Sequence, residues 1–354
     1  LELSGAPLRT IHETCDEFHS HLDLVRRVSG PRGVIWLSLG INPLHEVETI
    51  PRMPKARYRI MREYLPTRGE LALHMMHLTA TVQANFDFAS EEDMVRKLRT
   101  ALGISPIISA LFANSSIVGG KASAFASRRV EIWHHTDPDR CGLLPFAFEA
   151  DFGYEGYVEW ALDVPLSFIV RDGAYLAAGG TTFREFMARG IEGHRPTLSD
   201  WNVHLTTLFP EVRLKRVLEV RGTDAVPSPL ICALPALWKG LLYDAEARES
   251  AWALVAEHGF EERAAGLADV ARRGLAGEMA GRPVRELAEE IVAISSQGLR
   301  RIGHAGQRDA DERSFLDPLR LQLESGRSPG EEILFRWEGD WARSVSRLIE
   351  YARY

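Results

Sequence analysis

Hydrophobic and polar positions repeat with two different periods along the chain. Between residues 5 and 29, apolar side chains recur in steps of three and four, the spacing of one face of a helix. These positions are Leu8, Ile11, Cys15, Phe18, Leu22 and Val25. The helix is expected to end at Gly30-Pro31, and the apolar residues 33–40 are expected to form a buried strand.

Residues 79–88, TATVQANFDF, alternate with period two, which is typical of a strand. An ordinary half-exposed strand would show this pattern. However, exposed strand faces are usually rich in Lys, Glu and Thr, whereas this polar face carries short neutral groups and one carboxylate. The face, which includes Gln83 and Asn85, is therefore a candidate for a wet, concave ligand surface.

Residues 212–221, VRLKRVLEVR, predict a second strand with an unusual charged face. Three cations, Arg213, Lys215 and Arg221, share one parity with Glu219. A solvated charged face would explain this pattern. A site for a metal-bound polyphosphate would explain it equally well, because carboxylates hold Mg²⁺ and Arg or Lys neutralises phosphate oxygens. The residues alone leave both interpretations open.

The remaining pattern predicts an α+β fold rather than a doubly wound α/β fold. Ser90 is expected to cap a helix over 91–102, and Asp172-Gly173 predicts a hairpin within 164–177. After Asp244 the chain becomes helical, with helices expected near 245–258, 283–301 and 331–353. We therefore expect a catalytic α+β region over 1–244 and a helical region over 245–354, packed together in one domain.

Composition narrows the class of protein. The chain has 354 residues, a net charge of −7 and 45% hydrophobic residues, as expected for a soluble enzyme. Mild acidity argues against a nucleic-acid binder, although a local basic patch could still bind polyphosphate. Without an apolar run of 18 residues or a signal-peptide pattern, we expect no membrane-spanning helix and a cytoplasmic location.

Short motifs give little further information. The spacing GxxxxGK[ST] is absent, so Gly119-Gly120-Lys121 resembles only part of a phosphate loop. The three cysteines are too few for a disulfide scaffold, and none lies in a CxxC motif that would indicate zinc. On spacing alone they are interpreted as buried or free thiols.

Long sequence blocks identify a family resemblance that covers the whole chain. The blocks include ELSGAPLRTIHETC (2–15), TVQANFDFASEEDMVRKLR (81–99), PTLSDWNVHLTTLFPEVRLKRVLEVRG (196–222) and CALPALWKGLLYD (232–244). They resemble plant-type glutamate–cysteine ligases, a form also found in many proteobacteria. The resemblance implies a glutamine-synthetase-like cup, built on a curved, mainly antiparallel sheet with flanking helices and a helical C-terminal third.

The resemblance also implies a reaction. Using ATP and Mg²⁺, such enzymes join the γ-carboxylate of glutamate to the amine of cysteine through γ-glutamyl phosphate, the first step of glutathione biosynthesis. The resemblance implies glutamate, cysteine and ATP as small-molecule partners and a possible homodimer. It implies neither a nucleic-acid partner nor a membrane partner.

By the same resemblance, individual residues receive expected roles. Glu2 and Glu219 correspond to Mg²⁺ ligands. The catalytic cations Arg213, Lys215 and Arg221 are expected to face the ATP phosphates or the acyl phosphate. Gln83 and Asn85 are expected to lie near the nucleotide and the metal. Arg129 is expected to bind the glutamate carboxylate. Met76 and Tyr157 are expected to line the cysteine pocket.

The resemblance further implies a redox-sensitive disulfide between Cys15 and Cys232, with Cys141 free. Family members continue roughly a hundred residues further at the amino terminus and carry a GxExE-type pair of metal carboxylates there. By this resemblance, we expect Leu1 to lie inside a domain rather than at its beginning.

Some positions depart from the family pattern. Leu78 stands where the family has Arg. Residues 120–124 read GKASA where the family has GKPNG, so 122–124 differ, and residues 223–230 replace ADGGPWRRL. Loss of a bidentate donor and an aromatic wall could change the amine that is accepted. Two alternatives therefore stand beside the ligase: a related ligase for another amine, and an inactive or regulatory homologue.

Overall fold

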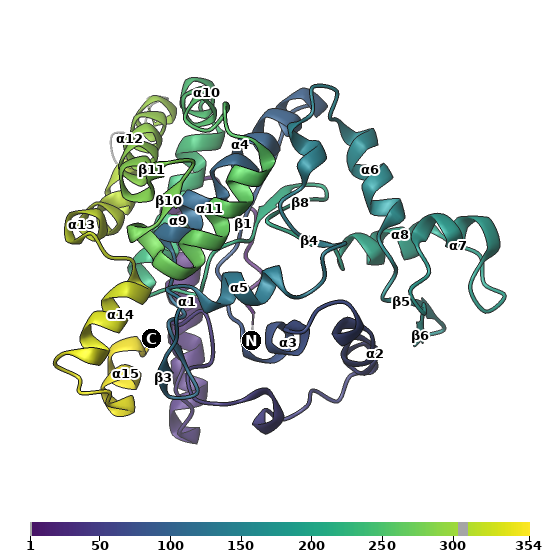
Figure 1. Cartoon of the computed structure of the whole chain (residues 1–354), viewed down its shortest axis with the longest axis horizontal. Helices are drawn as coiled ribbons and strands as arrows, with labels where there is room; N and C mark the ends of the chain where they lie inside the picture. Colours follow the sequence, from purple (N-terminus) through teal and green to yellow (C-terminus); the bar gives the residue numbers. More distant parts are fainter. Residues whose placement is uncertain (1, 304–310) are drawn as a thin grey trace.

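Helices dominate the structure and enclose several small sheets (Figure 1). The computed structural model describes residues 2–303 and 311–354. The helices before residue 210 are α1 (Ile11–Ser29), α2 (Ala56–Tyr64), α3 (Ala72–Leu78), α4 (Glu91–Leu111), α5 (Arg128–His134), α6 (Tyr154–Asp163), α7 (Phe183–Arg189) and α8 (Leu198–Leu205). The later helices are α9 (Ser228–Leu242), α10 (Ala245–Ala253), α11 (Phe260–Arg273), α12 (Val284–Ile302), the 3-10 helix η6 (Glu312–Leu316), α13 (Asp317–Ser325), α14 (Pro329–Glu338) and α15 (Val345–Ala352).

The strands are short, and most pair antiparallel. They are β1 (Ala84–Phe86), β2 (Ile117–Val118), β3 (Lys121–Ala122), β4 (Cys141–Gly142), β5 (Phe168–Arg171), β6 (Ala174–Ala177), β7 (Phe209–Pro210), β8 (Val212–Leu214), β9 (Leu218–Val220), β10 (Glu278–Met279) and β11 (Arg282–Pro283). The exception is the parallel pair of β4 and β7. The expected α+β class is therefore observed.

A three-stranded sheet with the order β1-β9-β8 lies at the centre of the molecule. Its register pairs Phe86 with Leu218 and Leu218 with Leu214, so these apolar side chains share one face. All three belong to the main hydrophobic core. Because neighbours in register point to the same side, the intervening residues of the three strands share the opposite, polar face.

The prediction of one continuous strand over 212–221 is wrong. The segment forms a hairpin, in which β8 and β9 are joined by the turn Lys215–Val217. No Gly, Asn or Pro marks this turn, so the local signal for a hairpin was missing. The turn has an odd number of residues, and the alternation therefore continues through it without a break.

The core behind the sheet is built around α4, which is buried on every side from Thr100 to Leu111. This helix extends beyond the predicted end at Leu102. Gly103 does not end the helix; it brings α4 close to α10 and the segment after it, because a Cβ at this position would lie 3.0 Å from Val255 and 3.1 Å from Trp252. The glycine therefore serves packing rather than termination.

Helices α9 and α12 cross with their backbones in contact. A Cβ built on Gly240 would lie 2.3 Å from the carbonyl oxygen of Ser295, and one on Gly298 would lie 2.0 Å from the carbonyl oxygen of Gly240. The C-terminal helices thus contribute to the same core as the sheet. The division into regions 1–244 and 245–354 stays a prediction.

Two predictions near the amino terminus need correction. The first helix begins at Ile11 rather than near residue 5, because Thr10 and Glu13 form a capping box. Residues 33–40 do not form a buried strand: among residues 2–303 and 311–354, their only strand pairing is the single bridge from Leu37 to Arg353, and the side chains of Val34 and Ile35 are exposed.

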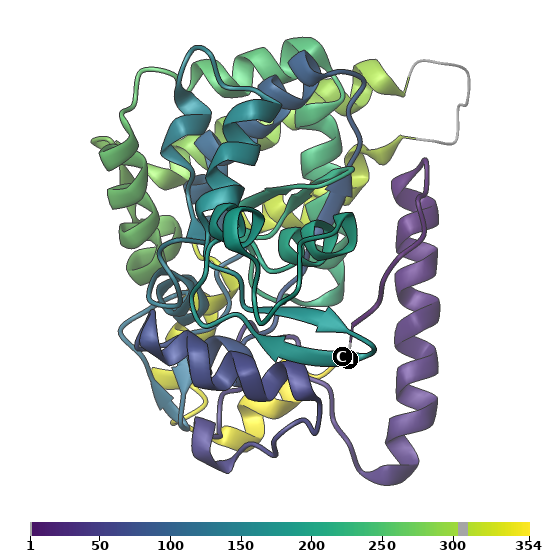
Figure 2. The same cartoon turned by 90° about the vertical axis from the view of Figure 1, so that its right-hand side faces the viewer.

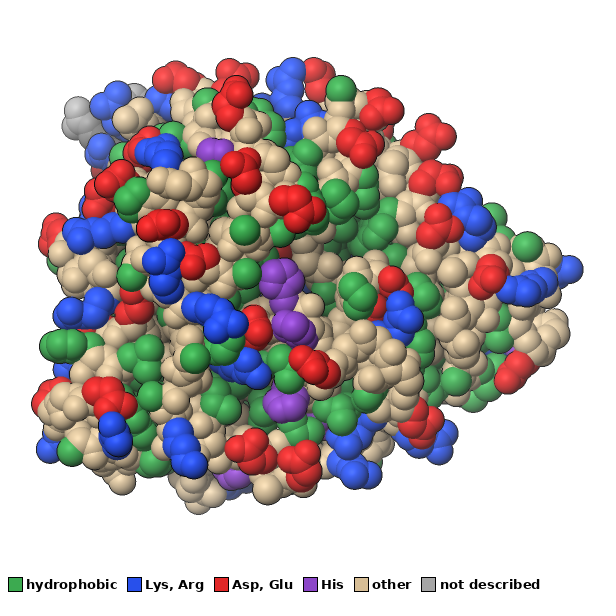
Figure 3. All heavy atoms as spheres, in the orientation of Figure 1, with side chains coloured by type: hydrophobic (Ala, Val, Ile, Leu, Met, Phe, Trp, Pro, Cys, Tyr) green, Lys and Arg blue, Asp and Glu red, His purple; other side chains and the backbone are tan. Residues whose placement is uncertain are grey.

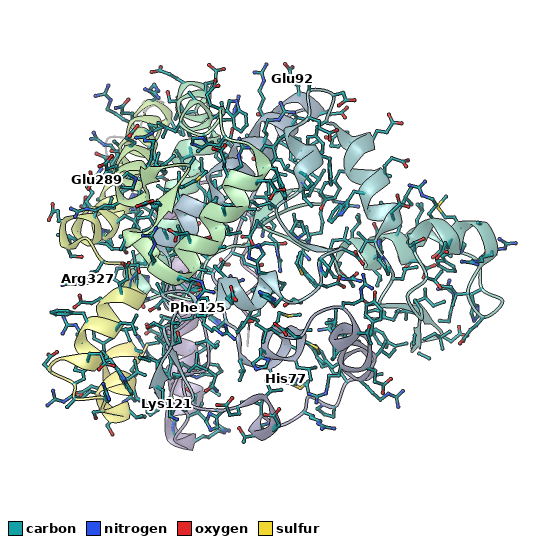
Figure 4. All side chains as sticks on the ribbon, in the orientation of Figure 1. His77, Glu92, Lys121, Phe125, Glu289 and Arg327 are labelled. Carbon is teal, nitrogen blue, oxygen red and sulfur yellow. A yellow bond between two sulfur atoms is a disulfide. The ribbon has the colours of Figure 1, made fainter. Side chains whose placement is uncertain are left out.

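The two predicted turns have clear outcomes. Asp172 and Gly173 join β5 to β6 with φ angles of 49° and 77°, which confirms the predicted hairpin. Gly119 and Gly120 also adopt positive φ, as the turn between β2 and β3. Figure 4 shows Lys121 at the lower margin of the molecule, far from the central sheet. The resemblance of this turn to a phosphate loop therefore reflects hairpin geometry.

Candidate functional site

The polar face of the central sheet carries the charged residues that sequence analysis singled out. Arg213 of β8 lies opposite Glu219 of β9. Its Nε donates to Oε2 of Glu219 at 2.6 Å, and Nη2 lies 2.6 Å from the same oxygen. Nη1 donates to the carbonyl oxygens of Thr206 (2.9 Å) and Leu208 (3.0 Å). Arg213 is therefore a fixed cation rather than a mobile surface side chain.

These charged side chains belong to a row of polar residues across the sheet, which continues on both sides of Glu219. Nη1 of Arg221 donates to Oε2 of Glu219 at 3.0 Å and to Oε1 of Gln83 at 3.3 Å. Asn85 is in register with Glu219 on the other side of β9. The structure thus brings both polar segments onto one surface, although they lie more than a hundred residues apart in the chain.

Neighbouring cations keep the Glu219 carboxylate ionised. Burial raises the pKa of Glu219, but the cations outweigh burial, and the net effect is a lowered pKa. These cations are Arg221, Arg213 and Lys215. Burial and repulsion from Arg213 lower the pKa of Lys215, whereas attraction to Glu219 and, more weakly, to Glu2 acts in the opposite direction. Glu2 itself is exposed.

This lowered pKa predicts a pH dependence. Because the folded-state pKa of Glu219 lies below the ordinary value of 4.5, its ion pairs stabilise the fold fully above that value and progressively less as pH falls through the lowered pKa. Urea unfolding should therefore show wild type more stable than Glu219→Gln at pH 7, with the gap narrowing below about pH 4.5. A gap that is constant from pH 7 to pH 3 would contradict the pairing.

A small recess adjoins the row, and its wall contains one residue, Glu211, that sequence analysis missed. Arg129, Glu211 and Arg221 contribute to the lining. Nη2 of Arg129 donates to the carbonyl oxygen of Arg221 at 3.0 Å. In the described part of the chain, neither Nε of Arg129 nor Oε2 of Glu211 has a hydrogen-bond partner. Enclosed polar atoms without partners are candidates to bind a ligand.

Burial shifts the pKa values of the two charged groups in this recess in opposite directions. It raises the pKa of the Glu211 carboxyl and lowers that of the Arg129 guanidinium. Glu211 lies two residues before Arg213 and has the same parity, so extending the alternating pattern by one step would have identified it.

Asp224 is a second residue that sequence analysis did not assign to the site. Its carboxylate accepts hydrogen bonds from the backbone N–H of Asn114 (2.7 Å) and the hydroxyls of Ser115 (2.7 Å) and Ser127 (2.9 Å). Ser127 also caps α5, the helix that carries Arg129. Asp224 is therefore expected to position Arg129, and no sequence signal marked this buried network.

The predicted cysteine-pocket residues have different environments. Met76 is half-buried in α3, a helix that packs against α5. Tyr157 is buried, and its hydroxyl accepts a hydrogen bond from the backbone N–H of Leu214 at 3.1 Å. Burial raises the pKa of Tyr157. The role of both residues in a cysteine pocket stays a prediction.

Leu78, which replaces the arginine of the family, lies in a small apolar cluster. It packs with Ile41, Val47 and Ile132, and its exposed fraction is 3%. The side chain therefore fills a local core and offers no contact to a charged substrate.

The residues of the row fit Mg²⁺ in the kind of atom that they offer. Magnesium prefers oxygen ligands, and Glu219, Gln83 and Asn85 all present side-chain oxygens on this face. All three short contacts to Glu219 involve Oε2, and among the described residues Oε1 receives no hydrogen bond. No group of three carboxylate, His or Cys ligands gathers around Glu219 within the described residues, so Glu219 would be the main charged ligand here.

The predicted disulfide is confirmed. Cys15 of α1 and Cys232 of α9 are bonded, 217 residues apart in sequence. Cys141 is free, and burial raises its pKa to about 12. The interpretation of all three cysteines as unpaired thiols, made from spacing alone, is therefore wrong.

The outer surface carries both signs of charge. On the face in Figure 3, acidic and basic side chains alternate, and histidines gather near the middle. Within residues 2–303 and 311–354, none of the helices has both the length and the apolar character that crossing a membrane requires.

Comparison with known proteins identifies the family. The model of "Glutamate-cysteine ligase family 2 (GCS2)" matches residues 1–350. The chloroplastic glutamate–cysteine ligase B of Oryza sativa subsp. japonica is 46% identical over 356 aligned residues, covering 100% of this chain and 71% of that protein. The chloroplastic enzymes of Medicago truncatula and Arabidopsis thaliana are each 44% identical over 100% of the chain, covering 69% and 67% of those proteins.

These names correct one prediction. Each of the relatives named above is chloroplastic, which points to a plastid and contradicts the predicted cytoplasmic location. The prediction relied on the absence of an apolar signal segment, a criterion that does not detect the Ser- and Arg-rich transit peptides of plastids. The matches over the full length of the chain lead to one conclusion about its ancestry: the chain belongs to glutamate–cysteine ligase family 2.

Proposed function

We propose that this protein is a glutamate–cysteine ligase, which uses ATP and Mg²⁺ to join the γ-carboxylate of glutamate to the amine of cysteine. The observation that carries this proposal is the row of Arg213, Glu219 and Arg221 on the sheet, with Gln83 and Asn85 beside it, in a chain of this family. By the same proposal, the three-stranded sheet belongs to the curved sheet of a glutamine-synthetase-like cup. The reaction is the first step of glutathione biosynthesis.

The chemistry requires activation of a carboxylate, which is a poor acyl donor. The γ-carboxylate of glutamate attacks the γ-phosphorus of ATP and gives γ-glutamyl phosphate and ADP. The cysteine amine then attacks the acyl carbon and releases phosphate. Magnesium, when bound, offsets charge on the phosphates. Glu219 and Glu2, with the amide oxygens of Gln83 and Asn85, would hold it.

The cations of the row have the complementary task. Arg213, fixed by two carbonyl oxygens, and Arg221 present guanidinium groups that can neutralise equatorial phosphoryl oxygens without reorganisation. Lys215, at the tip of the hairpin, adds a more mobile positive charge. Arg129 would bind the glutamate α-carboxylate with its two-pronged guanidinium.

The first test is turnover with trapping of the intermediate. With glutamate, cysteine and Mg²⁺-ATP, the protein should release one ADP per γ-glutamylcysteine. Replacing cysteine with hydroxylamine should give γ-glutamyl hydroxamate, the diagnostic product of an acyl phosphate. ADP release with glutamate and a different amine, but not with cysteine, would favour a related ligase for another amine. The buried Leu78 and the changed residues 223–230 are the reason to test this alternative. Nucleotide binding without turnover would favour an inactive homologue.

Arg129→Lys tests the glutamate site. Lysine keeps the positive charge but cannot donate two parallel hydrogen bonds to a carboxylate as a guanidinium does. We therefore expect the KM for glutamate to rise at least about tenfold, with a much smaller change in kcat. Arg128→Lys is the matched control, because Arg128 precedes Arg129 in the chain and stacks over Phe125 instead. An unchanged KM in Arg129→Lys would remove Arg129 from the substrate site.

A further inference from the structure

The junction between α1 and α9 contains a third side chain with metal-binding chemistry. His19 lies one turn after Cys15 on α1, so both side chains project from the same face of the helix. One ligand atom from each of Cys15, His19 and Cys232 can be chosen so that all three lie within 4.8 Å of one another. In the described part of the chain, this is the one group of three such residues that could hold a metal ion.

The imidazole of His19 keeps one ring nitrogen available for coordination. Its Nδ1 lies 2.8 Å from the carbonyl oxygen of Cys15, and only a protonated Nδ1 can donate to a carbonyl. This contact fixes the tautomer in which Nε2 carries the free lone pair. Metal-bound histidines in proteins usually have their second nitrogen held in this way.

The junction is also accessible from one side. Cys232 is buried in α9, Cys15 is half-buried and His19 is exposed, so the site opens to solvent on the side of the histidine. Figure 2 shows α1 along one flank of the molecule. A soluble reductant or a metal ion can therefore approach from that side.

We propose that reduction of the Cys15–Cys232 disulfide converts this junction into a binding site for a divalent cation of the zinc class, held by two thiolates and the imidazole of His19. A dithiol reductant supplies two electrons and two protons to the S–S bond and leaves as a cyclic disulfide. Metal binding then releases the two thiol protons. The fourth position of the tetrahedral ion is taken by water.

The distances suit this assignment. Zinc binds thiolate sulfur at about 2.3 Å and imidazole nitrogen at about 2.0–2.1 Å, so ligand atoms on one tetrahedral ion lie within about 4 Å of one another. Rotation of the exposed His19 side chain and the half-buried Cys15 side chain can reach this spacing from the observed 4.8 Å limit, with the buried Cys232 kept in place. In the reduced protein, the metal would connect α1 to α9 in place of the disulfide.

The second attachment of α1 lies at its first turn. Glu312 of η6 accepts from the backbone N–H of Ile11 at 2.7 Å, and Lys239 of α9 donates to the carbonyl oxygen of Arg9 at 2.9 Å. Beyond residue 19, Arg26 and Arg27 have exposed side chains but lie in the helical backbone of α1, which trypsin must open before it can cut. Losing the connection at Cys15 should therefore expose the distal half of α1 to proteolysis.

The binding test uses full-length protein in a Cys141→Ser background, which removes the remaining thiol. Titration with Co²⁺ should give one equivalent of tetrahedral, sulfur-ligated cobalt in the reduced protein and none in the oxidised protein, and Zn²⁺ should displace it. His19→Ala should weaken binding at least about tenfold. His21→Ala, on the same helix, is the matched control and should bind normally.

Two results would overturn the proposal. They are equal binding by the oxidised and reduced proteins, and equal binding by His19→Ala and its background. Limited trypsin digestion gives an independent readout: reduced, metal-free protein should be cut in α1 faster than oxidised protein, and Zn²⁺ should restore protection in the background protein but not in His19→Ala. Both measurements are independent of ligase turnover.

Discussion

Glu219→Gln should abolish Mg²⁺-dependent ATP turnover while leaving the fold intact. The amide has nearly the shape of the carboxylate and can still accept hydrogen bonds from Arg213 and Arg221. It cannot supply the negative charge that a magnesium ion requires. Loss of one electrostatic group aimed at a developing charge typically reduces kcat by about 10²–10³-fold, and we expect at least that reduction.

The measurement is steady-state ADP release with glutamate and cysteine, over a range of Mg²⁺ concentrations. Circular dichroism and the thermal midpoint verify that the variant is folded. Glu155→Gln, on the exposed side of α6, serves as the matched control and should keep wild-type rates. Near-normal turnover by the Glu219 variant would refute its role as a metal ligand.

Reduction of the Cys15–Cys232 disulfide should lower stability by about 2–4 kcal/mol. The bond joins residues 217 apart, so it removes much conformational entropy from the unfolded chain. For a domain of this size, we expect the thermal midpoint to fall by several degrees. Differential scanning calorimetry with and without dithiothreitol, in the presence of a chelator, measures the shift.

Two variants separate the disulfide from general effects of reductant. Cys15→Ser should have the lower midpoint whether or not reductant is present, and its mobility on a non-reducing gel should match that of reduced wild type. Cys141→Ser should keep the full response to reductant, because Cys141 takes no part in the bond. Equal midpoints for oxidised and reduced wild type would contradict a stabilising role.

Sequence periodicity predicted the polar face of the central sheet correctly from an incorrect topology. The charged residues were assigned to one strand, whereas Arg213 and Glu219 lie on two antiparallel strands. Residues of equal parity still share a face because the three-residue turn preserves the alternation. In contrast, periodicity could not show that Asn85 lies beside Glu219, since this pairing depends on long-range register.

Buried and long-range features limited the rest of the prediction. The partner of Cys15 could not be deduced from spacing and came only from the family resemblance. The carboxylate of Asp224, which fixes the start of α5, sits in a network of serine hydroxyls and backbone atoms that no linear motif marks. The start of α1 was predictable, because Thr10 and Glu13 form a recognisable capping box.

The apolar cluster around Leu78 also limits how residues can be exchanged between this protein and its family. Leu78→Arg would restore the residue of the family pattern, but it would place a cation among Ile41, Val47 and Ile132. An uncompensated buried charge costs about 3–5 kcal/mol, a large share of the stability of a typical domain. Substrate preference therefore cannot be transplanted at this position alone; a graft would have to replace the surrounding cluster together with the arginine.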